Sequence, residues 1–315
     1  MDTFIVATYC LVDEAMDDES LGDEEGRRLC QRGPNPALDD REVLTIELVG
    51  EFLGIDTDEG IYRYFRRHYT GWFPALGRVH RTTFARQAAN PWKAKELLWR
   101  ALLASGGVEY DPKVSLVDSF AEPVCSFAKA PRCKGFAGEA ACGHDAMNKG
   151  FFYGFRAHLR VCWPGVIVAA SLAPANEHDR WVVESDLFLS PPPPPPPPEV
   201  EEKGGWLLGD TNYSSPTLTE ELRRRHDEVS LVAPKKTSVK RERHPWPRWL
   251  IAVRRRIETV ASQLVERYRV KRVRARDRWH LTSRFLRKVL SHTCCVLLCQ
   301  RERLSPLRFS ELVTH

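Results

Sequence analysis

The sequence predicts a mixed α/β fold in which a β-sheet flanked by helices follows an α-helical amino-terminal region. Apolar residues recur at helical spacing between residues 39 and 103, and the periodicity changes to β-rich runs at Val114. Beyond a predicted hairpin, strands and helices alternate, which is typical of a mixed sheet with helices packed on it. The chain has 315 residues, 43% of them apolar, and is therefore long enough for two domains.

Residues 1–108 are predicted to form the helical region. The apolar spacing predicts three helices, at residues 39–54, 58–68 and 82–103. Short helices joined by tight turns are typical of a helix-turn-helix, in which Arg81 and Arg86 would contact DNA. A helical bundle that only packs on the next domain explains the same pattern.

Residues 109–292 are predicted to carry the sheet, and residues 293–315 a carboxyl-terminal tail. Strands are expected at residues 114–118, 151–161, 166–172, 205–209 and 229–233, and helices at residues 176–187, 217–226 and 248–269. The turn Trp163-Pro164-Gly165 makes the second and third strands an antiparallel hairpin. Eight consecutive prolines lie within residues 190–203, and we interpret them as a stiff surface insertion, because polyproline cannot join a sheet.

The formal net charge of +5 conceals a strong asymmetry along the chain. Residues 1–60 carry a net charge of −13, whereas residues 235–315 carry +16. A cationic carboxyl end is typical of a surface that neutralises phosphates, and a solvated helix face balanced by the acidic amino-terminal part is the alternative. No apolar run approaches the roughly 18 residues of a membrane span, and no basic flank precedes the first apolar stretch. We therefore expect a cytoplasmic protein with no membrane contact.

Nine cysteines show no spacing typical of a disulfide framework, which favours a reducing compartment. Cys125, Cys133, Cys142 and His144 have the composition of a zinc site. Their gaps of eight and nine residues lack the close pairs that structural zinc usually takes, so we favour free thiols over zinc.

Three carboxylates stand out by their position. Asp118 and Asp210 each end a predicted buried strand, and Glu258 lies on a long helix amid arginines. Strand ends at one sheet edge can place two carboxylates together, and a helix on that sheet can bring a third. Such a trio can hold two divalent cations roughly 3.5–4 Å apart, which is phosphoryl-transfer chemistry on a nucleic acid. Glu266 is the competing third carboxylate.

Five motifs occur in order over about residues 110–292. They are Leu116-Val117-Asp118-Ser119-Phe120, Tyr153-Gly154-Phe155-Arg156-Ala157-His158, Ala175-Asn176-Glu177-His178-Asp179, Leu208-Gly209-Asp210-Thr211-Asn212-Tyr213 and Arg254-Arg255-Arg256-Ile257-Glu258-Thr259. As a set, they resemble the bacterial insertion-sequence transposases of the DDE type. The resemblance implies a ribonuclease-H-like catalytic domain with Asp118, Asp210 and Glu258 as the metal-binding catalytic triad.

The resemblance also implies that Arg254, one helical turn before Glu258, grips a phosphate. The family pattern has a tyrosine and a lysine where this chain has Ile251 and Val265, so Arg255, Arg256 or Arg267 is the alternative phosphate contact. The DNA-contacting residues expected are Arg254, Arg255, Arg256, Arg267, Lys271 and Arg272, together with Arg81 and Arg86.

Five residues of the motifs are expected to support the triad: Arg156, His158, Asp179, Asn212 and Tyr213. Arg156 and His158 share one face of their strand by the period of two, although a packed core histidine explains His158 equally well. Asp179 either supports the metal or caps its helix, and we favour the cap. Asn212 and Tyr213 follow Asp210 closely enough to shape the site.

The activity implied by the resemblance is that of a DNA transposase, an endonuclease of DNA recombination. With Mg²⁺, or Mn²⁺ as a substitute, it would cleave the ends of an insertion sequence and transfer the strands into target DNA. Its partner would be double-stranded DNA, both terminal inverted repeats and target, and a homodimer is expected because two ends must be joined. The expected location is the bacterial cytoplasm at the nucleoid. The alternatives are a ribonuclease-H-like nuclease without strand transfer and a catalytically decayed, DNA-binding copy of this transposable element's enzyme.

Overall fold

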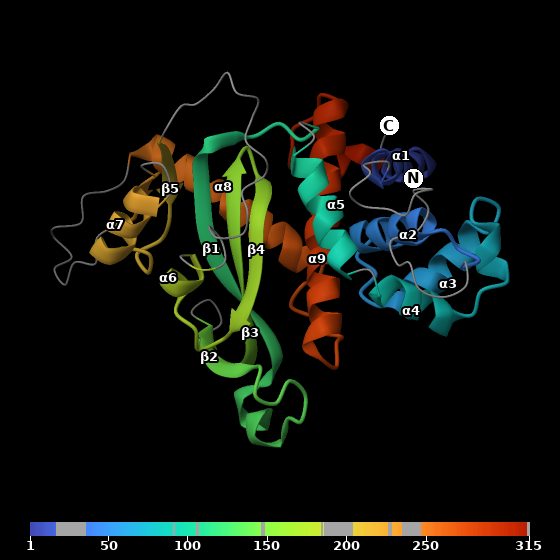
Figure 1. The fold of residues 1–315 in the computed structure, drawn as a ribbon, viewed down its shortest axis with the longest axis horizontal. Coiled ribbons are helices and arrows are strands. Elements are labelled where there is room, and N and C mark those ends of the chain that lie inside the picture. Colours follow the sequence, from blue (N-terminus) through green and yellow to red (C-terminus); the bar gives the residue numbers. More distant parts are fainter. Residues whose placement is uncertain are drawn as a thin grey trace. The chain divides into compact units, whose positions relative to one another are not determined.

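The computed structural model describes residues 1–16, 36–90, 92–104, 107–145, 149–183, 185, 204–225, 229–234 and 247–313 (Figure 1). The chain separates into two compact units. Unit 1 comprises Met1–Val108 and Gln263–His315, and unit 2 comprises Glu109–Ser262. The proline insertion expected at residues 190–203 lies outside the described residues.

Unit 2 contains a six-stranded mixed sheet. Its strands are β1 (Asp111–Ser126), β2 (Ala141–Asp145), β3 (Gly150–Trp163), β4 (Val166–Pro174), β5 (Gly205–Leu208) and β6 (Val229–Val232). The order β4-β3-β1-β5-β6 runs across the sheet. Strand β3 is antiparallel to both β4 and β1, and β5 is parallel to both β1 and β6. The β3–β4 hairpin and the mixed sheet flanked by helices confirm the predicted fold class.

Strand β1 is longer than predicted. It continues to Ser126 and pairs with β3 over this whole distance, with an irregularity in register between Pro123 and Cys125. A proline normally argues against a central strand, because it cannot donate to the ladder. The irregular pairing accommodates Pro123. The short strand β2, which no periodicity predicted, pairs with Gly150–Gly154 of β3, next to the part of β3 that pairs with β4.

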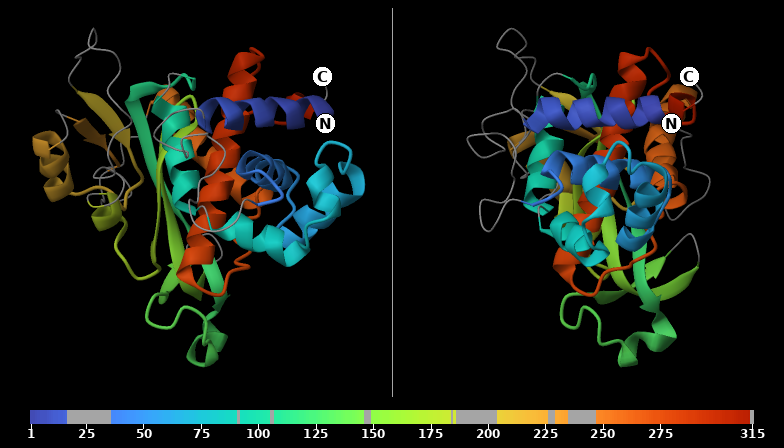
Figure 2. Two further views of the ribbon diagram at one scale, coloured as in Figure 1. Left: turned by 45° about the vertical axis from the view of Figure 1, so that its right-hand side comes forward. Right: turned by 90° about the vertical axis from the view of Figure 1, so that its right-hand side faces the viewer.

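Helices pack on the sheet of unit 2 (Figure 2). They are α6 (Asp179–Val182), α7 (Pro216–Arg225) and α8 (Arg248–Glu266). A 3₁₀ helix, η2 (Phe127–Arg132), lies between β1 and β2 in the sequence. One core cluster combines Val117 and Leu207 of the sheet with Tyr213 and with Leu218 and Leu222 of α7. Burial of these apolar side chains therefore fixes the turn after β5 against the sheet.

Unit 1 is helical, as predicted. Its helices are α1 (Asp2–Met16), α2 (Asp40–Phe52), α3 (Asp58–His68), α4 (Arg81–Ala89), α5 (Trp92–Ala104) and α9 (Arg278–Arg301), with the 3₁₀ helices η1 (Pro74–Gly77) and η5 (Glu311–Val313). Asp39 and Glu42 form a capping box at the start of α2. The single helix expected at residues 82–103 is wrong: α4 and α5 replace it, and Pro91 falls between them in the sequence, where its ring would disrupt a continuous helix.

The last long helix, α9, has 24 residues and runs through residues 292 and 293, where we placed the boundary of a tail. Its residues from Val289 to Cys299 are buried. These residues belong to the core of unit 1. None of the described helices has both the length and the apolar character that crossing a membrane requires.

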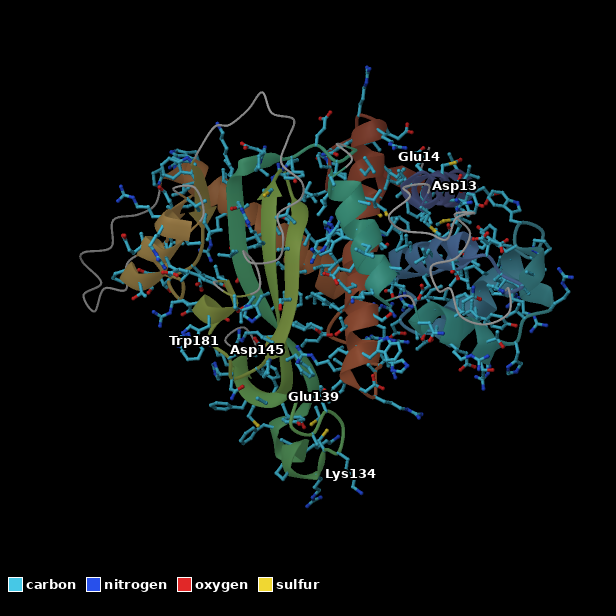
Figure 3. All side chains as sticks on the ribbon, in the orientation of Figure 1. Asp13, Glu14, Lys134, Glu139, Asp145 and Trp181 are labelled. Carbon is cyan, nitrogen blue, oxygen red and sulfur yellow. The ribbon has the colours of Figure 1, made fainter. Side chains whose placement is uncertain are left out.

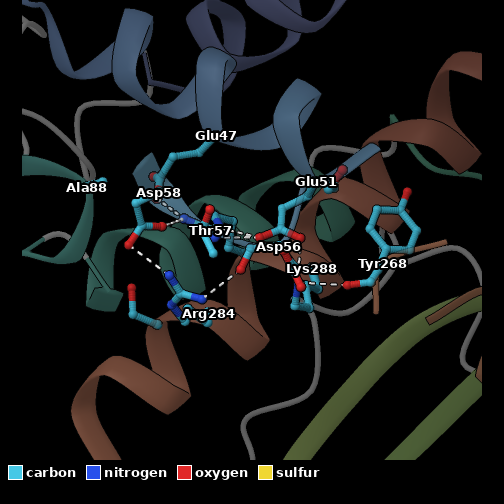
Figure 4. Close-up of polar contacts among 12 residues, drawn as sticks. Glu47, Glu51, Asp56, Thr57, Asp58, Ala88, Tyr268, Arg284 and Lys288 are labelled. Atoms are coloured by element: carbon cyan, nitrogen blue, oxygen red, sulfur yellow. Dashed lines mark hydrogen bonds and ion pairs between the residues drawn. The ribbon is translucent and has the colours of Figure 1, made fainter. Parts of the chain in front are cut away.

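A network of buried charges joins four helices of unit 1 (Figure 4). Glu47 of α2 pairs with Lys95 of α5 at 2.9 Å and with Arg287 of α9 at 2.7 Å. Arg287 also pairs with Asp58 of α3 at 2.8 Å. The side chains of Glu47 and Lys95 are fully buried. Such charges are tolerated in a core only when each has partners, so this network holds the four helices in one arrangement.

Candidate active site

Asp118 and Asp210 lie on neighbouring parallel segments of unit 2. Leu116 of β1 pairs with Leu208, the last residue of β5, and each aspartate comes two residues later. Parallel strands point their carboxyl ends to the same edge, so the two aspartates share one end of the β1–β5 ladder. The prediction that Asp118 ends its strand is wrong. Strand β1 continues in its pairing with β3, where Asp118 lies opposite Leu159. It lies just past the last residue pair that joins β1 to β5.

The surroundings of Asp118 oppose its ionisation. Burial raises the pKa of the Asp118 carboxyl to about 6, and the negative charges of Asp210 and Asp179 act in the same direction. The backbone N–H of Ser119, which donates to Asp118 Oδ1 at 2.8 Å, and the positive charge of Arg254 lower this pKa. Asp118 thus has two carboxylates and one guanidinium in its electrostatic neighbourhood.

Asp210 is held by the residues that follow it. The backbone N–H of Asn212 donates to Asp210 Oδ1 at 2.8 Å, and the Asn212 side chain donates to Oδ2 at 3.1 Å. Tyr213 turns back into the core and is 1% exposed. A Cβ on Gly209 would lie 2.9 Å from the Tyr213 ring, so glycine is required for this close approach. Asn212 and Tyr213 therefore both shape the turn that carries Asp210.

The pKa of Tyr213 is affected by three aspartates of this region. Burial raises the pKa of the Tyr213 phenol well above its ordinary value, and the charges of Asp179, Asp118 and Asp210 raise it further. The charges of three carboxylates therefore act on the same phenol. Asp179 joins the two predicted aspartates at this end of the sheet.

Asp179 does not cap its helix. The residue at the cap of α6 is His178, which makes no side-chain cap hydrogen bond. Asp179 Oδ1 instead accepts a hydrogen bond from the Ser119 hydroxyl at 3.1 Å and lies 3.8 Å from His158 Nδ1. Farther along α6, Trp181 lies at the surface (Figure 3). The cap interpretation is therefore wrong, because the carboxylate is turned toward β1 and β3.

Arg156 and His158 contact this group from β3. Arg156 Nη1 donates to Ser119 Oγ at 3.4 Å, and Arg156 Nη2 donates to the carbonyl of His144 at 2.7 Å. The imidazole of His158 is fully buried, and its ring lies beside Asp179. Sequence reasoning did not count Ser119 among the site residues, although it directly follows Asp118 and links it to Asp179. Its place in the Asp118 motif was the available signal.

Glu258 and Arg254 both lie on α8, one turn apart. Arg254 is half-buried and its charge reaches Asp118, whereas Glu258 is exposed. No group of three His, Cys, Asp or Glu side chains able to hold a metal ion occurs within the described residues. The conformation described thus brings Asp118, Asp210 and Asp179 near one another, but it does not gather Asp118, Asp210 and Glu258 into a metal-binding group. Glu266, the competing carboxylate, belongs to unit 1.

The arginines expected to contact DNA have different surroundings. On α8, Arg255 is exposed, whereas the guanidinium of Arg256 lies 4.8 Å from the centroid of the Trp163 ring. In unit 1, Arg267 lies 4.7 Å from the centroid of the Phe52 ring, and Arg272 pairs with Asp56 at 3.2 Å. Arg256 and Arg267 therefore already have partners within the protein.

The remaining predicted contacts also belong to unit 1. Lys271 is half-buried, Arg86 is exposed, and Arg81 pairs with Glu59 at 2.8 Å. Gln87, which follows Arg86 on α4, donates to the Leu38 carbonyl at 2.9 Å and to Asp40 at 2.8 Å. The amide of Gln87 is therefore engaged in joining α4 to the start of α2.

The cysteine group that resembled a zinc site lies at the other end of β3. Cys125 of β1 and Cys142 of β2 both pair in register with Tyr153, and both are free thiols, as is Cys133. Within the described residues, which include these cysteines, no three His, Cys, Asp or Glu side chains are placed so that they could hold a metal ion.

Comparison with known families identifies unit 2. Residues 110–278, more than half of the chain, match the family model described as "Transposase DDE domain". The chain belongs to this family. The expected resemblance to DDE-type transposases is thereby confirmed, and Asp118, Asp210 and Glu258 all lie inside the matched DDE domain.

Other comparisons found less. A cryo-EM structure of the piggyBac transposase synaptic complex with hairpin DNA has a TM-score of 0.47 to the DDE protein described here, at 10% sequence identity. The similarity covers 98% of this chain and 76% of that chain. None of the curated proteins compared with the chain matches it significantly.

Proposed function

We propose that this member of the DDE family is a DNA transposase that cleaves DNA at the ends of its element and joins the freed 3′-hydroxyls to target DNA. The observation that carries the proposal is the position of Asp118 and Asp210, each two residues past a paired leucine at one end of the β1–β5 ladder. Two carboxylates at such an edge, beside an arginine, are suited to phosphodiester chemistry.

The donor chemistry of this edge fits a divalent cation. Carboxylate oxygens are the ligands that Mg²⁺ prefers. Burial first, and then the charges of Asp210 and Asp179, raise the pKa of Asp118, and a bound cation would stabilise the ionised carboxylate against both effects. We propose that Asp118 and Asp210 hold Mg²⁺, or Mn²⁺ in its place, and that Glu258 joins them when DNA and cation bind. Such ions, when bound, activate a water or a 3′-hydroxyl and stabilise the leaving oxygen.

The protein's own side chains position these groups. Asn212 donates hydrogen bonds to both carboxylate oxygens of Asp210. Ser119 donates its backbone N–H to Asp118 and its hydroxyl to Asp179, and so links these two carboxylates. Arg254 supplies the guanidinium that would grip a phosphate beside Asp118, since arginine binds phosphate oxygens through paired N–H donors. Arg255, exposed on the same helix, would extend this contact along the DNA.

The partners follow from the reaction. Terminal inverted repeats and target DNA are the proposed ligands, with unit 1 and the basic carboxyl-terminal residues contributing to DNA binding. Two element ends must be cut and joined in one complex, so we propose a homodimer on DNA. The proposed setting is the nucleoid of a bacterial cytoplasm.

The test uses the purified full chain, duplexes that carry the inverted repeats bracketing its gene, and Mg²⁺. Asp118→Asn, Asp210→Asn and Glu258→Gln should each abolish end cleavage and leave DNA binding intact. Glu266→Gln is the matched control and should cleave normally. Loss of cleavage in Glu266→Gln, with normal cutting by Glu258→Gln, would move the third carboxylate to Glu266.

Substrates with pre-cut ends separate the proposal from its alternatives. Strand-transfer products in target DNA support a transposase. End cleavage without joining would indicate a nuclease, and Mg²⁺-independent binding with neither reaction would indicate a decayed copy.

A further inference from the structure

Unit 1 has a hollow of about 360 Å³ between α3 and the start of α4. The residues that line it are Tyr62, Arg63, Arg66, Arg67, His80 and Arg81. All four arginines are exposed, and they come from segments more than ten residues apart in the sequence. The fold thus gathers cations that no single sequence motif contains.

The positive charge of this hollow is only partly compensated. Glu59 Oε1 pairs with both Arg63 Nη2, at 2.7 Å, and Arg81 Nη1, at 2.8 Å. Within the described residues, Glu59 is the one carboxylate that forms an ion pair with any of the four arginines. Cations therefore outnumber the carboxylate, and the shared Glu59 holds Arg63 and Arg81 side by side.

Arg66 is held in place by Tyr62, which is buried beneath it. The Tyr62 hydroxyl, on a residue 4% exposed, donates to the Val79 carbonyl at 2.8 Å. Arg66 Nη1 donates to the same hydroxyl at 3.0 Å, and the Arg66 guanidinium lies 5.7 Å from the centroid of the Tyr62 ring. A ligand that binds Arg66 would therefore meet a guanidinium whose freedom is already reduced.

Helix dipoles explain the positions of only some of these arginines. Arg66 and Arg67 lie in the last turn of α3, where cations stabilise the carboxyl end of a helix. That effect does not explain Arg81, the first residue of α4, where the positive end of a helix disfavours a cation and favours an anion. The combined charge of Arg81 and the helix end adds to the attraction for an anion.

We infer that this hollow, which we call the α3–α4 hollow, binds phosphate groups of the duplex DNA backbone. The inference rests on the proposed function, because it takes DNA as the partner. Guanidinium groups bind phosphate oxygens through two parallel N–H donors, and several arginines in one hollow suit the regular phosphates of one strand. Backbone contacts position a protein without reading bases, so the α3–α4 hollow contributes affinity for any sequence.

The test measures fluorescence anisotropy of a labelled duplex with the full chain, without divalent cations, at several salt concentrations. The variant Arg63→Gln/Arg66→Gln/Arg67→Gln should bind more weakly, and its slope of log affinity against log salt should become shallower by about 0.9 for each phosphate that the variant no longer neutralises. The loss should be equal for terminal-repeat and unrelated duplexes. The control, Arg78→Gln/Lys93→Gln, removes two exposed cations of the same unit that do not line the α3–α4 hollow and do not belong to the basic carboxyl-terminal region, and it should keep the wild-type slope.

A second variant guards against misfolding as an explanation. Glu59→Gln removes the carboxylate from the α3–α4 hollow but keeps an oxygen that accepts hydrogen bonds from Arg63 and Arg81. It should bind duplex DNA more tightly than the wild type at low salt, which a misfolded protein would not do.

Three results would overturn the inference: an unchanged salt slope in the Arg63/Arg66/Arg67 variant, an equal loss in the control, or a loss confined to single-stranded RNA or an acidic peptide. Cleavage by the wild type with Mg²⁺ is measured separately. Its absence would count against the proposed function and would leave the binding result standing.

Discussion

Ser119 donates its hydroxyl hydrogen bond to Asp179 Oδ1 at 3.1 Å, while its backbone N–H donates to Asp118 Oδ1 at 2.8 Å. One residue of β1 therefore connects the Asp118 carboxylate to the first residue of α6. Arg156 also donates to the Ser119 hydroxyl oxygen, so the connection is held from β3 as well. Asp179 contributes to the site by holding this connection.

The first prediction concerns Asp179. We expect Asp179→Asn to lower the rate of end cleavage by about 10- to 100-fold and to raise the Mg²⁺ concentration needed for half-maximal cleavage, as loss of a group that orients a metal ligand does. Affinity for the duplex should not change. The control is Glu177→Gln, an exposed carboxylate two residues earlier, and an equal loss there would show that the effect is not specific to Asp179.

The second prediction compares two arginines on α8. Arg254 acts on Asp118, whereas Arg256 lies over the Trp163 ring. We expect Arg254→Gln to slow end cleavage strongly, and Arg256→Gln to leave cleavage near the wild-type rate while lowering the thermal unfolding midpoint, because a cation–π contact is worth roughly 0.5–1 kcal/mol at such a site. Cleavage rates and unfolding midpoints of both variants would be measured. The reverse pattern would assign phosphate gripping to Arg256.

The third prediction concerns the buried charges of unit 1. Lys95 Nζ contacts Glu47, the Ala88 carbonyl at 2.6 Å and Ser283 Oγ at 3.3 Å, with no exposure to solvent. Lys95→Met should lower the free energy of unfolding by about 3–5 kcal/mol, because it leaves part of the Glu47 charge uncompensated in the core. The exposed pair between Arg308 and Glu311 is the control, and Arg308→Ala should cost less than about 1 kcal/mol. Urea denaturation measures both, and equal effects would refute a special role for the buried pair.

The fourth prediction concerns pH. His292 is fully buried in unit 1, with Nε2 3.0 Å from Gln263 Oε1, and burial lowers the pKa of its imidazole to about 3. In the unfolded chain a histidine has a pKa of about 6.5 and takes up a proton below it. The folded state does not, so stability falls as the pH drops from about 6.5 towards 3, by up to about 1.4 kcal/mol per pH unit.

His292→Gln should remove this part of the pH dependence. Urea unfolding at pH 7.5, 6 and 5 would show a shallower loss of stability in the variant than in the wild type. Parallel curves would mean that His292 becomes protonated in the folded state.

Much of unit 2 could be predicted because its signals are local. Alternating and apolar runs located β3, β4, β5 and β6, and the residues around Asp118 and Asp210 placed both aspartates near one sheet edge. The extension of β1 could not be predicted, because Pro123 argues against a strand and only the irregular pairing with β3 accommodates it. Strand β2 could not be predicted either, because it has only five residues, without a clear alternation of apolar and polar side chains, and it forms by pairing with β3.

By itself, the sequence indicated the helices α2 and α3, the strands β3 to β6, the family that the five motifs point to, and the carboxylates and arginines that are candidates for the chemistry. Tertiary structure alone decided that Asp179 turns toward Ser119, that Arg256 lies on Trp163, that Lys95 is buried against Glu47, and that four arginines of α3 and α4 surround one hollow. Periodicity and capping depend on neighbours along the chain, so sequence reveals them. A side chain's partner depends on which distant segments pack against it, and that packing is settled only when the whole core is buried.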